Sequence, residues 1–122
     1  MKKVSVTKSF CFEAAHHLPD YNGACSQLHG HSYKMQVTVS GSVDNVSGMV
    51  LDFTVLKRIV SEIIVKRYDH QYLNDFFKVP TAENMVQRFF EDLDSEFIKL
   101  GITLESVKLW ETEDSFAECL RR

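Results

Sequence analysis

The chain has 122 residues, of which 44% are hydrophobic and 25% charged, and its formal net charge is −3. This balance supplies enough apolar side chains for a packed core and excludes a disordered chain. The charges of both signs are interspersed and form no basic footprint, so we expect no nucleic-acid partner. The length predicts a single domain over residues 1–122.

Two features of the sequence bear on where the protein works. No apolar run is long enough to cross a membrane, so we expect no membrane partner. The residues after Met1 lack the apolar stretch of a secretory signal, and three cysteines without paired spacing argue against a disulfide scaffold. We therefore expect a cytoplasmic protein whose cysteines are thiols.

The N-terminal part of the chain predicts two strands. Apolar residues alternate from Val4 to about His16, which is typical of a strand with one buried face. The Pro-Asp-Tyr-Asn-Gly run at 19–23 predicts a loop. A second alternating segment runs from about His31 to Val43, and residues 41–48 carry turn chemistry.

The middle of the chain predicts two helices. The first begins near Asp52 or Thr54, either of which could be its N-cap. The second opens at Pro80-Thr81 with Thr81 as N-cap and stops at Gly101. Apolar residues recur at helical spacing in both segments, which indicates that each helix buries one face.

The C-terminal part alternates again through Val107, Leu109 and Glu111, and residues 116–120 predict a short last strand. The resulting order is β-β-α-α-β-β. It predicts an α+β fold, with an antiparallel sheet and both helices on one face. Four strands leave exposed edges, which favours a homo-oligomer assembled through those edges.

Histidines form the densest chemical feature, at Leu28-His29-Gly30-His31. Residues two apart in a strand point to the same side, so His29 and His31 can aim their rings at one point. His16 ends the inward-facing set of the first strand, whereas His17 points the opposite way and is a poor ligand candidate. If the two strands are neighbours, three imidazoles converge, and three neutral histidines around an open position form a catalytic zinc site.

Alternatives to this zinc site remain open at the level of the sequence. The two histidines of the His-x-His pair could be unrelated surface residues, or Cys25 could close a structural site as a fourth ligand. Structural zinc sites usually use more than one cysteine. Cys25 otherwise reads as a nucleophile or general base, because a nearby cation or metal lowers a thiol pKa from about 8.5. Cys11 and Cys119 lie in strand patterns, where we expect small core residues.

Asp69-His70 follows the first helix and is a candidate for proton transfer. A carboxylate can orient an imidazole, which exchanges protons near neutral pH. From spacing alone, a polar loop that ends the helix is the simpler interpretation. Asn74-Asp75, a few residues later, indicates a turn only.

Glu111 is a candidate for ligand binding, because it lies at the end of a buried face. A carboxylate accepts two parallel N–H donors, and pterins and guanines present such an edge. Spacing alone favours a solvated glutamate beside Glu113 and Asp114.

Six blocks of residues resemble one known family in their order and spacing. The blocks are Phe12-Glu13-Ala14-Ala15-His16, Cys25-x3-His29-Gly30-His31-Ser32, Gly48-Met49-Val50-x-Asp52-Phe53, Asp69-His70-x2-Leu73-Asn74, Pro80-Thr81-x-Glu83-Asn84 and Trp110-Glu111-Thr112. Together they cover nearly the whole chain and resemble the 6-pyruvoyl-tetrahydropterin synthase family. The short interval between Cys25 and His29 is more similar to the branch that forms 6-carboxy-5,6,7,8-tetrahydropterin in queuosine (7-deazaguanine) biosynthesis.

The resemblance implies a fold, an assembly and a set of site residues. The fold is the tunnelling fold (T-fold), whose subunits assemble into barrels, commonly as a homohexamer of two trimers. The implied roles are zinc binding by His16, His29 and His31, proton transfer by Cys25, Asp69 and His70 with parts from neighbouring subunits, and pterin binding by Glu111 with help from Glu83.

The resemblance also implies an activity. A zinc-dependent lyase would convert 7,8-dihydroneopterin triphosphate to 6-carboxy-5,6,7,8-tetrahydropterin and release acetaldehyde and triphosphate. One alternative is the branch that stops at the 6-pyruvoyl product. Another is a non-catalytic, zinc-containing module that binds a pterin or purine, which would need the histidines but not Cys25 or Asp69-His70.

Overall fold

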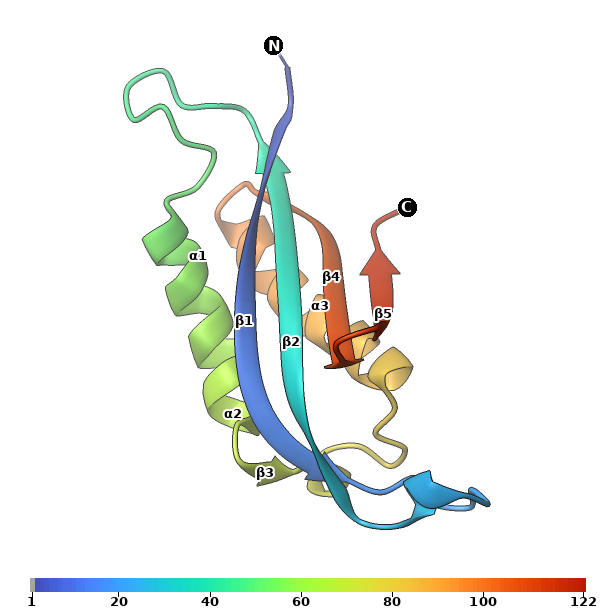
Figure 1. The fold of residues 1–122 in the computed structure, drawn as a ribbon. Coiled ribbons are helices and arrows are strands. Elements are labelled where there is room, and N and C mark those ends of the chain that lie inside the picture. The colour runs from blue at the N-terminus through green and yellow to red at the C-terminus, as the bar shows by residue number, and fades with distance from the viewer. Residues whose placement is uncertain (1) are drawn as a thin grey trace.

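A computed structural model describes residues 2–122, apart from the side chain of Cys25. In this part of the chain, five strands form one sheet in the order β3-β1-β2-β4-β5. Their bounds are Val4–His16 for β1, His29–Gly41 for β2, Gln71–Tyr72 for β3, Thr103–Thr112 for β4 and Ser115–Leu120 for β5. β1 and β2 are long and curved, and they extend beyond the helices at one end of the molecule (Figure 1).

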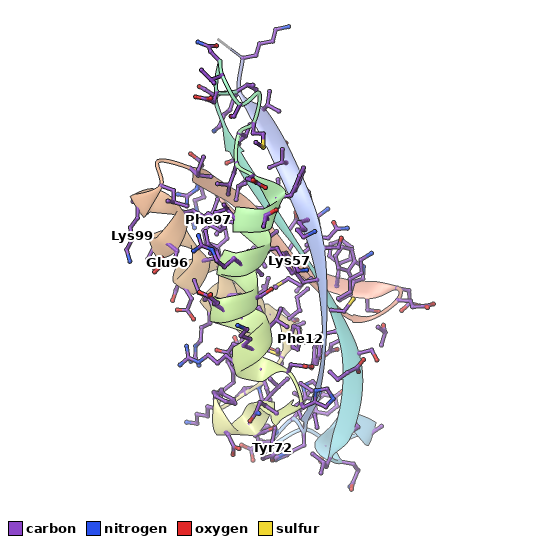
Figure 2. The ribbon with its side chains drawn as sticks, turned by 90° about the vertical axis from the view of Figure 1, so that its left-hand side faces the viewer. Phe12, Lys57, Tyr72, Glu96, Phe97 and Lys99 are labelled. Atoms are coloured by element: carbon purple, nitrogen blue, oxygen red, sulfur yellow. The ribbon has the colours of Figure 1, made fainter. Side chains whose placement is uncertain are left out.

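The helices lie together on one side of the sheet (Figure 2). α1 (Phe53–Val60) continues through a π-helical turn at Ser61–Val65 into α2 (Lys66–Tyr68), and α3 (Ala82–Lys99) packs beside β4 and β5. The α+β fold with helices on one face is therefore confirmed. None of the described helices is both long and apolar enough to span a bilayer.

The register between β1 and β2 brings the N-terminal histidines together. The two strands pair antiparallel without a slip, from Val4 opposite Gly41 to His16 opposite His29. Alternate β1 residues are buried toward the end of the strand because they face the helices, and His16 is the last of them. β2 begins at His29, two residues before the predicted start, because His29 and Gly30 still pair with β1.

Both predicted helix starts are confirmed by their caps. The Asp52 carboxylate accepts the backbone N–H of Thr54 at 2.8 Å, so Asp52 and not Thr54 is the first cap. The Thr81 hydroxyl accepts the N–H of Asn84 at 3.1 Å. Gly101 follows α3 with a φ of 70°, which a residue without a side chain adopts at no steric cost.

The core lies between the sheet and the helices. Phe12 on β1 stacks on Tyr33 of β2, with ring centroids 5.1 Å apart, and meets Phe89 of α3 edge-on at 6.2 Å. No helix in residues 2–122 covers the opposite face of the sheet (Figure 2). The prediction that Cys11 is a core residue is wrong, because its odd position in β1 points it to that uncovered face. Cys119 is half-buried and packs against the edge of the core.

β3 is the strand that the sequence did not predict. It pairs parallel to β1 through Ala14 opposite Gln71 and Ala15 opposite Tyr72. A strand of two residues has no periodicity to read, so only the fold reveals it. Along the rest of β1, no described residue pairs with the edge that faces away from β2.

Candidate active site

Three imidazoles converge where β1 ends and β2 begins. One ring nitrogen from each of His16, His29 and His31 lies within 4.8 Å of those of the other two. The ring centroids are 4.6 to 4.9 Å apart in every pair. The predicted convergence is confirmed as geometry, and these residues form a group that could hold a metal ion.

Backbone carbonyls fix the tautomers of two of these histidines. The Nδ1 of His16 lies 2.8 Å from the Pro80 carbonyl oxygen, and the Nδ1 of His29 lies 2.7 Å from that of Gln27. A carbonyl oxygen only accepts, so each Nδ1 carries the proton and donates it. The two Nε2 atoms are only 3.1 Å apart, and in the neutral form of both rings they face each other with their lone pairs.

This arrangement fits a bound cation. Two lone pairs at such a distance repel each other, and a metal ion between them would turn the repulsion into coordination. Metal-binding histidines usually donate the other ring N–H to a carbonyl or carboxylate, as His16 and His29 do here. The donor set of three imidazoles suits zinc with an open coordination position.

Burial favours the neutral form of two of the three imidazoles, His16 and His31. His16 is 1% exposed, and burial lowers its pKa to about 4. Burial also lowers the pKa of His31, while the nearby Glu111 carboxylate acts in the opposite direction. Both imidazoles are neutral at pH 7, which is the form that binds a metal. The buried Tyr33 hydroxyl lies 3.2 Å from His16 Nδ1 and adds a second contact to that ring.

Glu111 lies beside the histidines, on the helix-facing side of β4. Its Oε1 is 3.6 Å from His16 Nε2, and its side chain is only 31% exposed. It lines a hollow of about 460 Å³ together with Glu83, Ser115 and Phe116. Spacing alone favoured a solvated Glu111, but its side chain is half-buried. Glu83 and Glu111, the two predicted ligand-binding glutamates, line the same hollow.

Asp69 and His70 are held against β1. The His70 Nδ1 lies 3.0 Å from Asp69 Oδ2, while Asp69 Oδ1 accepts the Glu13 backbone N–H at 2.9 Å. The Glu13 N–H and then the His70 ring lower the pKa of Asp69, which keeps it ionised. His70 has a φ of 60°, a left-handed conformation that its hydrogen bond to the Glu13 carbonyl helps to hold.

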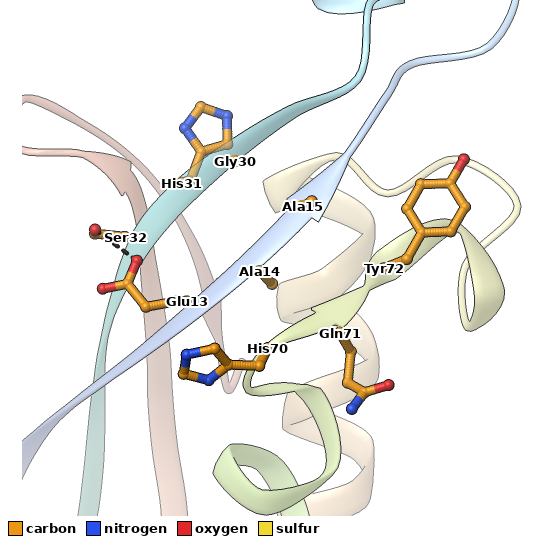
Figure 3. A pocket seen from close by; sticks show the side chains of 9 residues that line it. All are labelled: Glu13, Ala14, Ala15, Gly30, His31, Ser32, His70, Gln71 and Tyr72. Atoms are coloured by element: carbon orange, nitrogen blue, oxygen red, sulfur yellow. Dashed lines mark hydrogen bonds between the residues drawn. The ribbon is translucent and has the colours of Figure 1, made fainter.

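The His70 ring opens into a second hollow of about 470 Å³ (Figure 3). The floor is formed by small residues of β1 and β2, and the wall carries Glu13, whose carboxylate accepts the Ser32 hydroxyl at 2.6 Å. Glu13 and Ser32 are paired across the strands and point away from the helices. His31 borders this hollow, but Glu111 does not, so one chain does not bring Glu111 and His70 into the same hollow.

Residues 5–122 match the 6-pyruvoyl tetrahydropterin synthase family. The chain belongs to that family. It is a lyase of the family, and the resemblance carried by the six blocks is confirmed.

Relatives of known name cover almost the whole chain. A protein of Archaeoglobus fulgidus, provisionally named 6-carboxy-5,6,7,8-tetrahydropterin synthase, is 42% identical over 93% of this chain and 92% of its own. The 6-carboxy-5,6,7,8-tetrahydropterin synthase of Synechocystis is 38% identical over 92% of this chain and 89% of its own.

The fold agrees with that of a solved family member. The structure of Caenorhabditis elegans 6-pyruvoyl tetrahydropterin synthase superposes with a TM-score of 0.88 and 31% identity, over 100% of this chain and 98% of that one. The tunnelling fold is therefore confirmed for this chain.

Cys25 is the predicted site residue that cannot be placed beside the cluster. Its backbone lies in a 3-10 turn at Ala24–Ser26, within the loop that joins β1 to β2. Its side chain lies outside the described part of the chain, so its role remains a prediction.

Several contacts of the site have no pattern in the sequence that predicts them. The Pro80 carbonyl belongs to the backbone, so the residue type at this position does not predict its contact with His16. Tyr33 lies on the inward parity of β2, two residues after His31, and that parity would have placed it near the cluster. Glu13 has no sequence signal of its own beyond its place in the block of residues 12–16.

Proposed function

We propose that this member of the family is a zinc-dependent 6-carboxy-5,6,7,8-tetrahydropterin synthase of queuosine biosynthesis. It would convert 7,8-dihydroneopterin triphosphate and one water molecule to 6-carboxy-5,6,7,8-tetrahydropterin, acetaldehyde and triphosphate. The observation that carries the chemistry is the cluster of three histidines beside Glu111. The names of relatives between 33% and 42% identical support the carboxy-forming branch.

His16, His29 and His31 would hold the zinc ion, with two Nε2 lone pairs already directed inward. When bound, zinc supplies a Lewis acid that lowers the pKa of side-chain hydroxyls on the substrate. Burial at His16 excludes water from one side of the cluster, and the Pro80 and Gln27 carbonyls keep the rings from turning.

Glu111 would bind the pterin ring. Its carboxylate is half-buried, and it can accept two parallel N–H groups from the aminopyrimidine edge. Glu83 lines the same hollow and offers a second acceptor. Holding the ring there would place the substrate side chain near the histidines, because Glu111 and His16 are in close contact.

Cys25 and the Asp69–His70 pair would move protons. Cys25, as thiolate, would remove a carbon-bound proton next to the ring. His70 would accept or return protons, because Asp69 holds its Nδ1–H and leaves Nε2 free for exchange. Most of the His70 side chain, 78%, is exposed, so the ring is open to a substrate.

A complete site would need more than one subunit. Glu111 and His70 line different hollows of the same chain, so a neighbouring subunit would supply His70 to the site that holds Glu111. The free edge of β1 and the edge strand β5 support an assembly by strand pairing. We propose a cytoplasmic homohexamer of two trimers that form a barrel.

The first experiment is a product assay. Zinc-loaded protein would be incubated with 7,8-dihydroneopterin triphosphate, and acetaldehyde and the pterin products would be followed together. Acetaldehyde with a 6-carboxy pterin is the expected result. A 6-pyruvoyl product without acetaldehyde would move the protein to the branch of its Caenorhabditis elegans neighbour, and no turnover would favour a non-catalytic binding module.

Two variants belong in the same experiment. Cys25→Ala is expected to keep zinc and lose turnover, whereas loss of zinc would assign Cys25 to a four-ligand structural site. His31→Ala is expected to lose zinc and turnover together, and full activity without metal would contradict the zinc mechanism.

A further inference from the structure

Residues 69–74 run alongside residues 13–17, next to the end of β1 that carries the predicted metal ligand His16. The contacts follow in order along both segments. They are Asp69 and His70 with the backbone of Glu13, Gln71 opposite Ala14, Tyr72 opposite Ala15, and Asn74 with His17. The predicted acid–base pair and the predicted ligand His16 thus lie on two segments held in one register.

The last contact in this series is made by a side chain. Asn74 Oδ1 accepts the His17 N–H at 3.0 Å, and Asn74 Nδ2 donates to the His17 carbonyl at 3.0 Å. The backbone of β3 can no longer pair here, because the chain turns into a 3-10 helix at Leu73–Asp75. The side-chain amide of Asn74 therefore bonds the His17 backbone in place of a backbone partner from β3.

The backbone of His17 affects the position of His16, because the two residues share a peptide group. β1 ends at His16, and the loop toward β2 departs from His17. The N–H of His17 belongs to the peptide group that follows His16, so Asn74 fixes that peptide plane. Two ladder pairs join β3 to β1, and Asn74 adds two hydrogen bonds to the backbone of His17 where this short pairing ends.

We propose that Asn74 is a positioning residue for the metal centre. It holds the end of β1 so that the Nε2 of His16 stays directed at His29, and it sets the register between His16 and the Asp69–His70 pair. This inference rests on the proposed metal role of His16. It assigns a function to an asparagine whose sequence context indicated only a turn.

The His17 ring could also hold the end of β1, and its contacts are separate from those that Asn74 makes with the His17 backbone. The Tyr72 hydroxyl lies 2.6 Å from His17 Nδ1, and the two rings stack with centroids 5.9 Å apart. These contacts end at the His17 side chain, whereas Asn74 binds only its peptide groups. His17→Ala therefore removes the ring contacts and keeps the backbone clamp.

The test measures zinc affinity by chelator competition at pH 7.5, together with the visible absorption of the Co²⁺-loaded protein. Asn74→Ala is expected to weaken zinc binding by roughly 10-fold, the lower end of the loss seen for direct partners of metal ligands, because Asn74 holds the backbone after His16 and not its ring. The Co²⁺ spectrum is expected to change as well. His17→Ala is expected to bind zinc like the wild type. Thr7→Ala is the control, because it removes a 2.7 Å hydrogen bond from β1 to Thr38 of β2, far from the histidines.

The thermal midpoint of each metal-free variant shows that the folded state is populated during the titration. If Asn74→Ala does not fold, Asn74→Asp serves instead, because it keeps the acceptor for the His17 N–H and loses the donor to the carbonyl. Wild-type zinc affinity and an unchanged Co²⁺ spectrum in the folded Asn74 variant would overturn the inference alone. Wild-type protein that binds no zinc would overturn the proposed function, and the inference with it.

Discussion

At His16, burial and hydrogen bonding act on different properties of one side chain. Burial determines the charge, because it lowers the pKa to about 4 and leaves the imidazole neutral. The Pro80 carbonyl determines the tautomer, because it accepts from Nδ1 and leaves Nε2 for a ligand. The same residue also makes the folded state sensitive to acid.

The first prediction concerns the pH dependence of the metal-free protein. Above the unfolded pKa of 6.5, His16 is neutral in both states and contributes no pH dependence. As the pH falls toward 4, the unfolded chain takes up a proton that the folded chain refuses, so the free energy of unfolding decreases. Between pH 7 and pH 5 this loss is about 2 kcal/mol. Urea denaturation across this range measures it.

His16→Asn is the matched variant for this measurement. It lowers stability at every pH, but it removes the titrating group, so its free energy of unfolding should change less between pH 7 and pH 5. Equal slopes for the variant and the wild type would contradict the prediction.

The second prediction separates ligand binding from metal binding at Glu111. Glu111→Gln keeps the size of the side chain and loses its charge. A charge-assisted hydrogen bond contributes about 1.5–3 kcal/mol, so affinity for 7,8-dihydroneopterin should fall roughly 10- to 100-fold. Fluorescence titration measures this, and chelator competition should show nearly unchanged zinc affinity.

The control for Glu111 is Glu113→Gln, which changes an exposed carboxylate two residues along the chain. Unchanged pterin affinity in Glu111→Gln, or an equal loss in Glu113→Gln, would return Glu111 to the solvated role that spacing alone favoured.

At the scale of the elements, the start of α3 has two functions. Thr81 caps the helix, and Pro80 immediately before it presents its carbonyl to His16. Asn84 strengthens this junction, because its side-chain amide donates to the Val79 carbonyl at 2.9 Å. The start of α3 therefore contacts the candidate metal centre directly, through the Pro80 carbonyl and the His16 ring.

The third prediction tests the cap of α3. Thr81→Ala leaves the Asn84 N–H without its side-chain acceptor and should lower the free energy of unfolding by about 1 kcal/mol. Urea denaturation measures the change. Thr54→Ala is the control, because Thr54 lies in the first turn of α1 and does not cap it. An equal effect of the two substitutions would show that the Thr81 hydroxyl does not act as a cap.

At the scale of the whole molecule, one aromatic cluster joins the helices to the sheet. Phe89 of α3 is fully buried and meets Phe12 of the sheet, Tyr68 of α2 and Phe77 of the following loop. Each of these rings comes from a different segment of the chain. Their packing therefore fixes how the helix layer sits on β1, and with it the position of Asp69 next to Tyr68.

The fourth prediction follows from this cluster. Phe89→Ala should lower the free energy of unfolding by about 3–5 kcal/mol, because it removes buried area and leaves a cavity. Phe116→Ala, at a side chain that is 50% exposed, is the control and should cost much less. Denaturation at a fixed protein concentration compares them, and similar losses would place the stabilising core elsewhere.

The sequence by itself determined the features that depend on neighbours along the chain. Alternation located β1 and the last strands, side-chain chemistry located the Thr81 cap and narrowed the other cap to Asp52 or Thr54, and strand parity put His29 and His31 on one side of their strand. These signals are local, so they can be read without knowing which segments meet.

Only the tertiary structure decided the contacts between distant segments. The pairing of β3 with β1, the clamp of Asn74 on His17, the reach of the Pro80 carbonyl to His16 and the separate hollows of Glu111 and His70 all join residues far apart in the chain. Such contacts use backbone atoms or single polar side chains, which leave no periodic pattern in the sequence. Their positions follow from how the helices pack on the sheet, and that packing is a property of the folded chain.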